Sequence, residues 1–257
     1  MTKLPSRFHF ISAETIDATK ATHKLISIYG HSSLEESDVV VAIGGDGTML
    51  QTVRDVMNTG KPIYGMNQGS VGFLMNEFHE QKLPNRIAVA HKKEIHPLRM
   101  IAKAECQEYI EALAINEVSL FRQSYQAAKI RISIDDNVRM EQLNCDGILV
   151  ATPAGSTAYN LSAHGPILPL MAPLMALTPV SPFRPRRWHG ALLPNTAIVR
   201  FDMLEPKKRP VNAAADNVEV KSVHSVTISM ATEVTASILF DSNHSWDERI
   251  LSEQFRY

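Results

Sequence analysis

The first third of the chain alternates short apolar runs with longer amphipathic stretches. The runs are Phe8 to Ile11, Val39 to Ile43 and Pro62 to Met66. The second run is continuously apolar and β-branched, which is typical of a strand buried on both faces of a parallel sheet. Glycines follow it, and then apolar residues recur at helical spacing from Thr48 to Asn58 until Gly60 ends the stretch. This pattern predicts a β-α-β unit in an α/β domain with a Rossmann-like parallel sheet.

The apolar period changes from helical to two beyond about Leu98. Lys129 to Ile134 alternates, and Asp135 to Asn137 supplies a hairpin turn before Val138. Further candidate strands are Ile148 to Ala151, Ala197 to Phe201, Val223 to Met230 and Thr235 to Phe240. No long helix is predicted between the last three, which indicates a mostly β domain. We therefore expect an α/β domain over residues 1–98 and a mostly β domain over residues 99–243.

The C-terminal segment carries a helix signal. Ser245 and Glu248 have the spacing of a capping box. One helix face would be apolar, formed by Trp246, Ile250, Leu251 and Phe255. The segment 244–257 is thus predicted to be a helical tail that packs on the first domain.

Composition narrows the classes of partner. The chain has 257 residues, of which 44% are hydrophobic, and 26 Lys and Arg balance 27 Asp and Glu. This balance excludes a broad basic field for nucleic acid or anionic membranes, so an anionic ligand must be bound locally. Only Cys106 and Cys145 are available for a disulfide, which favours a reducing compartment. Met1 to Ile11 lack the apolar stretch of a signal peptide, and no long uncharged apolar run follows, so we expect a cytoplasmic protein.

A glycine-rich turn, Gly44 to Thr48, joins the buried strand to the predicted helix. Ligands of open α/β sheets bind at such strand ends, and the glycines and helix N-terminus suit a phosphate. Asp46 would repel a phosphate unless a divalent cation bridges them or the carboxylate acts as a base. Helix capping by Asp46 is an equally good interpretation on spacing alone. Neither a Walker P-loop nor a G-x-G-x-x-G segment is present, so those two folds are not supported.

Two further segments bear candidate ligand contacts. Cys145 to Asn160 is a buried strand that runs into a turn rich in small and hydroxyl residues. Ser156, Thr157 and Tyr159 could contact a sugar, a phosphate or a base there, although a purely structural turn is the other interpretation. Asn116-Glu117 lies in the β-like stretch 109–121 and could match an adenine edge, although two exposed polar residues at a strand end are the default.

In order and spacing, these segments resemble the NAD kinase family. The matching stretches are Gly44 to Thr48, Gly69 to Leu74, Asn116-Glu117 and Asp146 to Pro166, which together span most of the chain. The run Thr152 to Pro166 is the most specific, because related kinases share the glycine-aspartate motif but not this run.

The resemblance implies a kinase that uses ATP and a divalent cation, expected to be Mg²⁺, to phosphorylate the adenosine-ribose 2′-hydroxyl of NAD. It implies that Asp46 is the general base and that Gly47 lines the same site. Asn116 and Glu117 would face the adenosine, and Asp146 the nicotinamide side. The other implied contacts to the ligand are Phe73, Leu74, Ala154, Thr157, Ala158, Tyr159, Asn160, Leu161, Ser162, Ser181 and Asn217.

Two alternatives stay open at this point. One is a lipid or sugar kinase with the same glycine-aspartate motif, against which Thr157-Ala158-Tyr159 and Asn116-Glu117 argue. The other is a non-catalytic dinucleotide sensor, which the retention of Asp46 disfavours. No basic residue for the γ-phosphate is identified. The strand edges of the β domain and the family resemblance favour a homo-oligomer, either a dimer or a tetramer.

Overall fold

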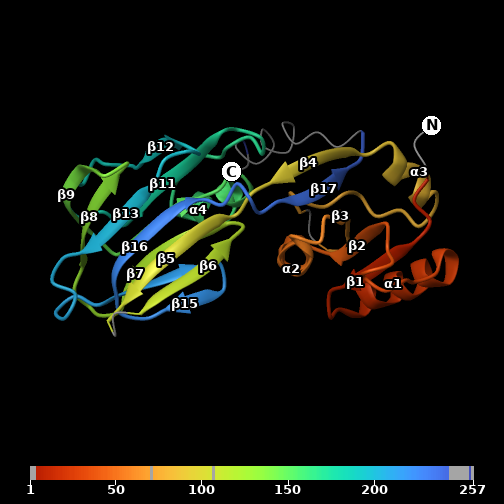
Figure 1. The fold of residues 1–257 in the computed structure, drawn as a ribbon, viewed down its shortest axis with the longest axis horizontal. Coiled ribbons are helices and arrows are strands. Elements are labelled where there is room, and N and C mark those ends of the chain that lie inside the picture. Colours follow the sequence, from red (N-terminus) through yellow and green to blue (C-terminus); the bar gives the residue numbers. More distant parts are fainter. Residues whose placement is uncertain (1–3, 70–71, 106–107, 243–254, 256–257) are drawn as a thin grey trace. The chain divides into compact units, whose positions relative to one another are not determined.

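The structure is a computed structural model that describes residues 4–69, 72–105, 108–242 and 255. The chain divides into two compact units, which we describe separately. Unit 1 comprises residues 1–95 and 234–257, and unit 2 comprises residues 96–233. Figure 1 labels their elements where there is room.

Unit 1 is a five-stranded sheet in the order β1-β2-β3-β17-β4. The first four of these strands are parallel, and β4 is antiparallel to β17. This bears out the predicted α/β architecture with a mostly parallel sheet. The elements of unit 1 are β1 (Phe8–Ser12), α1 (Ile16–Tyr29), β2 (Val39–Gly44), α2 (Asp46–Val56), β3 (Pro62–Asn67), α3 (Leu83–Ala88), β4 (His91–Ile95) and β17 (Ala236–Phe240).

The continuous apolar run of β2 is explained by helices on both faces of the sheet. Val39, Val41 and Ile43 join a buried cluster with the apolar side of α1. The residues between them on β2 are fully buried as well, on the face that α2 covers. Every residue of β2 is therefore buried, and its carboxyl end delivers the glycine-rich turn to one edge of the sheet.

Helix α2 begins at Asp46, two residues before the predicted start at Thr48. Gly45 is its N-cap and keeps an extended backbone, so the helix takes in the aspartate of the turn. The Asp46 side chain is thus not the N-cap group, and the helix starts without a side-chain cap hydrogen bond. The capping interpretation of Asp46 is wrong.

Unit 2 consists of two six-stranded antiparallel sheets. One has the order β6-β5-β16-β13-β8-β9, and the other has the order β12-β11-β10-β7-β14-β15. The strands of the first sheet are β5 (Leu98–Ala104), β6 (Tyr109–Ala114), β8 (Ala128–Ile134), β9 (Asn137–Cys145), β13 (Val199–Met203) and β16 (Val223–Met230). The second contains β7 (Glu117–Arg122), β10 (Gly147–Ala151), β11 (Leu174–Val180), β12 (Ala191–Pro194), β14 (Val211–Ala215) and β15 (Val218–Val220), with the short helices η1 (Ala154–Thr157) and α4 (Tyr159–Ser162) between β10 and β11.

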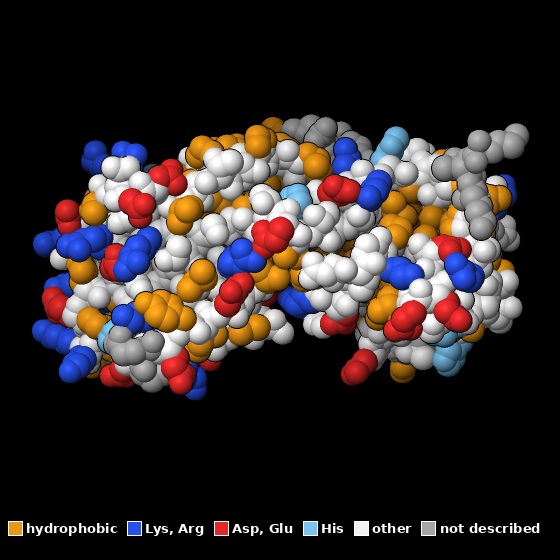
Figure 2. Space-filling view, viewed as in Figure 1, with side chains coloured by type: hydrophobic (Ala, Val, Ile, Leu, Met, Phe, Trp, Pro, Cys, Tyr) orange, Lys and Arg blue, Asp and Glu red, His pale blue; other side chains and the backbone are white. Residues whose placement is uncertain are grey.

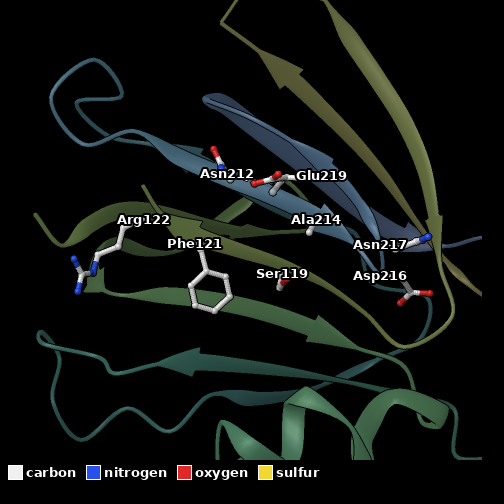
Figure 3. Close-up of a pocket in the computed structure, with 9 residues that line it drawn as sticks. Ser119, Phe121, Arg122, Asn212, Ala214, Asp216, Asn217 and Glu219 are labelled. Carbon is white, nitrogen blue, oxygen red and sulfur yellow. Dashed lines mark hydrogen bonds between the residues drawn. The ribbon is translucent and has the colours of Figure 1, made fainter. Parts of the chain in front are cut away.

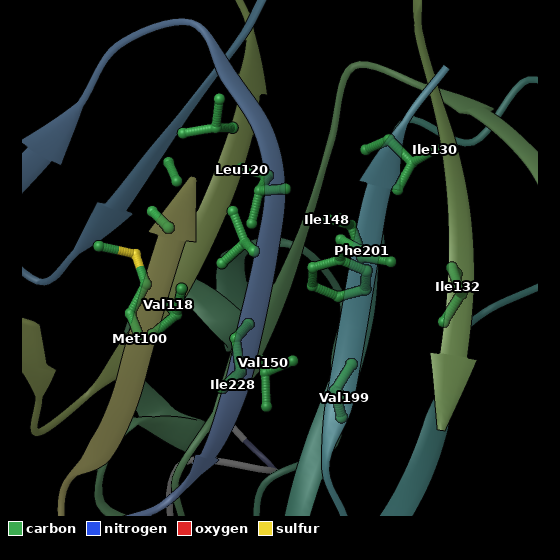
Figure 4. Close-up of a cluster of buried hydrophobic side chains, with 14 of the residues drawn as sticks. Met100, Val118, Leu120, Ile130, Ile132, Ile148, Val150, Val199, Phe201 and Ile228 are labelled. Atoms are coloured by element: carbon green, nitrogen blue, oxygen red, sulfur yellow. The ribbon is translucent and has the colours of Figure 1, made fainter. Parts of the chain in front are cut away.

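The two sheets of unit 2 enclose one apolar core, part of which is drawn in Figure 4. Alternate residues of β7 and β10, such as Val118 and Ile148, face Met100, Phe201 and Ile228 of the other sheet. The opposite face of β10 packs against the segment that contains η1 and α4. This packing places the small-residue turn on the outer face of the second sheet.

Two assignments from the sequence are corrected. The strand predicted at 235–240 was placed in the mostly β domain, but as β17 it lies between β3 and β4 in unit 1. The chain therefore returns to the first sheet as a strand, and the helix predicted at 244–257 falls outside the described residues except for Phe255. The prediction of an irregular loop over Pro179 to Pro194, from the many Pro and Arg residues of that stretch, is also wrong at its start, because β11 continues to Val180. Pro179 is tolerated there because β12 pairs only with residues 174–177 of β11.

Basic and acidic side chains are intermixed on the face drawn in Figure 2. This agrees with the near balance of charge in the sequence, at a formal net charge of −1. Among the described residues, no helix is long and apolar enough to cross a membrane.

Candidate functional site

In unit 1, the carboxylate of Asp46 accepts two backbone hydrogen bonds. The N–H of Phe73 donates to Oδ2 at 2.7 Å, and the N–H of Leu74 donates to Oδ1 at 2.9 Å. A Cβ atom at Gly72 would lie 2.5 Å from Oδ1, so only glycine allows this approach. Each carboxylate oxygen retains a second acceptor position, so Asp46 can still receive a proton or a hydrogen bond from a substrate.

Asn76 holds the segment that bears these two amides. Its side-chain amide, which is buried, donates to the carbonyls of Gly65 and Leu239, and its Oδ1 accepts from the N–H of Asp241. The Asn76 backbone also pairs with Gly65 and Asn67. Residues 72–76 are thereby fixed to the ends of β3 and β17, while the Leu74 side chain is 3% exposed and belongs to the core of unit 1.

The described residues contain no group of three or more His, Cys, Asp or Glu side chains that could hold a metal ion. At the glycine-rich turn the available carboxylate is Asp46, and both of its oxygens already accept from amides. Mg²⁺ is commonly bound by one or two carboxylates together with substrate phosphates. The residues therefore fit a cation that arrives with a nucleotide better than one held by protein alone.

In unit 2, the backbone of Asn116 is held between two elements. On one side, the N–H of Thr152 donates to the Asn116 carbonyl at 2.9 Å, and Gly155 lies so close that a Cβ atom would overlap that carbonyl. On the other, Asp216 accepts from the N–H of Asn116 at 3.0 Å. The predicted strand 109–121 is in fact two strands, β6 and β7, with Asn116 in the bend between them.

Glu117 is the first residue of β7, and its carboxylate is unusual. Oε2 is buried and has no hydrogen-bond partner among the described residues. Burial, reinforced by the negative charge of Asp216, raises the pKa of Glu117 to about 7. An ionisable group with a strongly shifted pKa and an unused acceptor is a common mark of a ligand site.

The turn after β10 combines structural and accessible residues. Asn160 is fully buried, and its side chain donates to the carbonyls of Ser156 and Pro166 while it accepts from the hydroxyl of Thr178. Its side chain is thus committed to the fold, although it was predicted to contact the dinucleotide. Ser156 is similarly occupied, because its hydroxyl accepts from the N–H of Leu168 and donates to Pro153.

Other residues of this turn are open to solvent or partly so. Tyr159 packs at a centroid distance of 5.6 Å on the ring of Phe121, and burial followed by the charge of Glu117 raises its pKa. Ser162 is exposed. Partly exposed as well are Thr157, Ala158 and Leu161, whereas Ala154 is buried.

Asp146 and Ser181 lie at the opposite ends of their strands from Asn116 and Thr157. The Asp146 N–H donates to the carbonyl of Val180, which places Ser181 beside it. The Asp146 carboxylate accepts from Nε of Arg122 at 2.6 Å. Ser181 is exposed, with a left-handed φ of 47°.

A pocket of about 180 Å³ lies on the outer face of β7, β14 and β15 (Figure 3). Asp216 and Asn217 are at one end of it and Arg122 is at the other. Its floor is formed by β7 and β14, with Ser119, Phe121, Asn212, Ala213 and Ala214, and Glu219 adds a carboxylate. Asn217, which the family resemblance implies as a ligand contact, therefore borders a cavity.

Sequence reasoning missed several residues that build these sites. Asp216, Asn76 and Arg122 were not among the predicted site residues. The predicted residues of unit 2 form two groups along β7 and β10, and those of unit 1 surround Asp46. A hydrogen-bonding role such as that of Asn76 depends on partners distant in the sequence, so no local pattern signals it.

Comparison with known proteins identifies the family. The model of the ATP-NAD kinase N-terminal domain matches residues 7–94, and that of the ATP-NAD kinase C-terminal domain matches residues 115–189. The chain belongs to the ATP-NAD kinase family. It is 66% identical to an NAD kinase of Brucella suis over 249 residues, which is 97% of each chain. It is 64% identical to an NAD kinase of Mesorhizobium japonicum, over 96% of each chain.

Solved structures share the fold. Yeast NADH kinase complexed with NADH superposes with a TM-score of 0.84 and 19% identity, over 99% of this chain and 90% of that chain. An NAD kinase from Archaeoglobus fulgidus in complex with ATP gives a TM-score of 0.76 and 21% identity, over 96% of this chain and 98% of that chain. At these identities the likeness describes the architecture of the family and not the roles of individual residues.

Proposed function

We infer that the chain is an NAD kinase, which transfers a phosphoryl group from ATP to NAD. The main support is the 66% identity to an NAD kinase over almost the whole of both chains. The models of both family domains match this chain, so the assignment does not rest on one domain alone. We further propose that the acceptor is the 2′-hydroxyl of the adenosine ribose, which makes NADP the product.

We propose that Asn116 and Glu117 bind the adenosine part of NAD. The unpartnered Oε2 of Glu117 can accept a hydrogen bond from an amino or hydroxyl group of the ligand. Such a bond stabilises the complex more than the same bond at the surface would, because a buried acceptor without a partner raises the free energy of the unliganded protein. Tyr159, packed on Phe121, offers an aromatic face beside this carboxylate.

The partly exposed residues Thr157, Ala158, Leu161 and Ser162 are proposed to line the dinucleotide. Ala154 is proposed to line it as well. Asp146 and Ser181 are proposed contacts of its nicotinamide side, Asn217 is a proposed further contact, and Phe73 and Leu74 are proposed apolar contacts. Asn160 stays in the proposal only through its backbone, since its side chain is occupied within the fold. The cytoplasmic location and the homo-oligomeric state stay predictions from the sequence.

We propose that Asp46 removes the proton from the 2′-hydroxyl during transfer, with Gly47 beside it. The amides of Phe73 and Leu74 fix the plane of its carboxylate, so that a free lone pair on either oxygen points in a defined direction. A positioned general base of this kind contributes a factor of roughly 10² to 10⁴ to the rate. Bound with the donor, a divalent cation would neutralise charge on the transferring phosphates.

The test is NADP formation by the purified protein with ATP, Mg²⁺ and NAD, compared for wild type and Asp46→Asn. The variant is expected to lose roughly 10²-fold or more in kcat. Its Kd for NAD, measured by calorimetry, should change little. Near-normal turnover by Asp46→Asn would rule out the role of base.

Asp55→Asn is a matched control, because Asp55 lies on the exposed side of the same helix and, among the described residues, its carboxylate bonds to Gln51 alone. It should retain wild-type turnover. Diacylglycerol and fructose 6-phosphate serve as alternative acceptors that distinguish a lipid or sugar kinase. NAD binding without NADP formation by the wild type would instead indicate a sensor.

A further inference from the structure

Asp216 occupies the turn between β14 and β15 and bonds to the start of β7. Its carboxylate accepts from the N–H of Ile115 at 2.8 Å, of Asn116 at 3.0 Å and of Glu117 at 3.3 Å. In return, its own N–H donates to the carbonyl of Glu117 at 3.1 Å. One aspartate thus organises three consecutive amides, and two of the three residues are those proposed to bind adenosine.

The same backbone is held from the other side by the turn after β10. Thr152 binds both carbonyls of the bend, with its N–H on Asn116 and its hydroxyl on Ile115 at 2.6 Å. Gly155 packs directly against Asn116. Without the Asp216 carboxylate, the carbonyls of the bend would still accept hydrogen bonds from Thr152, but the amides of residues 115–117 would lose their shared acceptor.

We propose that Asp216 is a positioning residue for NAD, which holds Asn116 and Glu117 in their binding geometry through the backbone. This proposal rests on the proposed function. Asp216 acts at one remove, because its carboxylate is committed to the three amides and the ligand contacts are made by its neighbours. Hydrogen bonds to an ionised acceptor are stronger than neutral ones, so an aspartate holds the backbone of this bend more firmly than a neutral side chain would.

Unit 2 contains a second turn aspartate, Asp135, with which the hydrogen bonds of Asp216 can be compared. Asp135, in the β8–β9 turn, also has a left-handed backbone, with φ 50° against 48° for Asp216. Among the described residues, its carboxylate accepts one backbone hydrogen bond, from the N–H of Ile198 at 2.9 Å, and its own N–H donates one to the carbonyl of the same residue. Asp216 has this reciprocal bond and two more, all directed at the Asn116 bend.

Electrostatics supports a role beyond turn formation. The charge of Asp216 lies close enough to Glu117 to raise its pKa further than burial alone does. Two neighbouring carboxylates repel, so the arrangement is unfavourable for stability in isolation. Asparagine adopts the left-handed conformation as well and would serve a simple turn without this repulsion.

The experiment compares wild type, Asp216→Asn, Asp216→Gly and the control Asp135→Asn as full-length proteins. NAD binding is measured by calorimetry, with no ATP present. Both Asp216 variants should weaken NAD binding about tenfold or more, while Asp135→Asn should bind as the wild type does. In steady-state assays, the KM for NAD should rise in the Asp216 variants, with kcat and the KM for ATP within about threefold of wild type.

Amide hydrogen exchange separates positioning from general destabilisation. In Asp216→Asn the amides of residues 115–117 should exchange faster than in wild type, while the amides of β10 and β11 keep their protection. Unchanged NAD affinity in both Asp216 variants, or unchanged exchange at 115–117, would overturn the proposal. Failure of the wild type to form NADP would count against the proposed function instead, because binding and exchange are measured without turnover.

Discussion

Glu117 shows at the scale of one residue how a site can oppose stability. Its Oε2 is buried without a partner among the described residues, and Asp216 adds a like charge nearby. A fold selected for stability alone would place an apolar or amide group there. The carboxylate is explained if a ligand donor completes it.

The raised pKa of Glu117 makes a prediction about stability and pH. Below about pH 4.5 the carboxyl is protonated in both the folded and the unfolded chain, so its titration does not change the free energy of unfolding. Between 4.5 and about 7, the folded protein keeps a proton that the unfolded chain releases, so stability falls as the pH rises. We expect Glu117→Gln to increase the free energy of unfolding on the order of 1–3 kcal/mol at about pH 8, with the gain shrinking toward pH 4.5.

Urea unfolding of wild type and Glu117→Gln at several pH values measures this difference. Glu14→Gln, at an exposed position, serves as the control and should follow the wild type throughout. A gain that is the same at low and high pH would contradict the assigned cause, because a neutral packing effect does not titrate.

At the scale of elements, η1 is placed by one close contact. Gly155 lies against the Asn116 backbone so tightly that any side chain would overlap it. Because the overlapped atoms are backbone, a larger residue must displace either η1 or the bend that bears Asn116 and Glu117. The packing of these two segments thus requires glycine at position 155.

We therefore expect Gly155→Ala to lower the free energy of unfolding by about 2 kcal/mol or more and to weaken NAD binding. Differential scanning calorimetry and NAD titration measure the two effects. Gly47→Ala is the control for stability, because a Cβ there meets nothing within 4 Å and the residue lies in α2. An unchanged melting temperature in Gly155→Ala would show that the bend yields at little cost.

Elements with a clear period were predicted well, and those without one were missed. The apolar runs that became β1, β2 and β3, and the β8–β9 hairpin, follow directly from the pattern. Strand β14 was missed because Asn212 to Ala215 has little β propensity, and the partner β7 supplies its order. The Asp46 turn was locatable from its glycines, whereas the hydrogen bonds from Asn116 to Asp216 and from Asn76 to Leu239 join residues 100 and 163 positions apart and leave no local signal.

At the scale of the whole molecule, a strand from the last part of the sequence pairs with strands from the first part. Strand β17, from residues 236–240, is inserted between β3 and β4, which come from the first hundred residues. Its five residues are all buried, and it is the strand that pairs with β3 on the side away from β2. Such a pairing is invisible in a linear pattern, which is why the sequence placed this strand in the wrong domain.

This topology predicts opposite behaviour for two fragments. Both sheets of unit 2 are complete within residues 98–230, so a fragment 96–233 has all its strand partners and its apolar core. A fragment 1–95 lacks β17 and would expose the edge of β3 together with unpaired backbone groups. We expect fragment 96–233 to show a cooperative urea transition and protected amides, and fragment 1–95 to show neither. Joining residues 234–257 to fragment 1–95 through a flexible linker should restore cooperative unfolding, because that segment contains β17, the strand that lies between β3 and β4. Cooperative unfolding of fragment 1–95 alone would mean that β1, β2 and β3 with their helices already form a sufficient core, and that β17 only completes it.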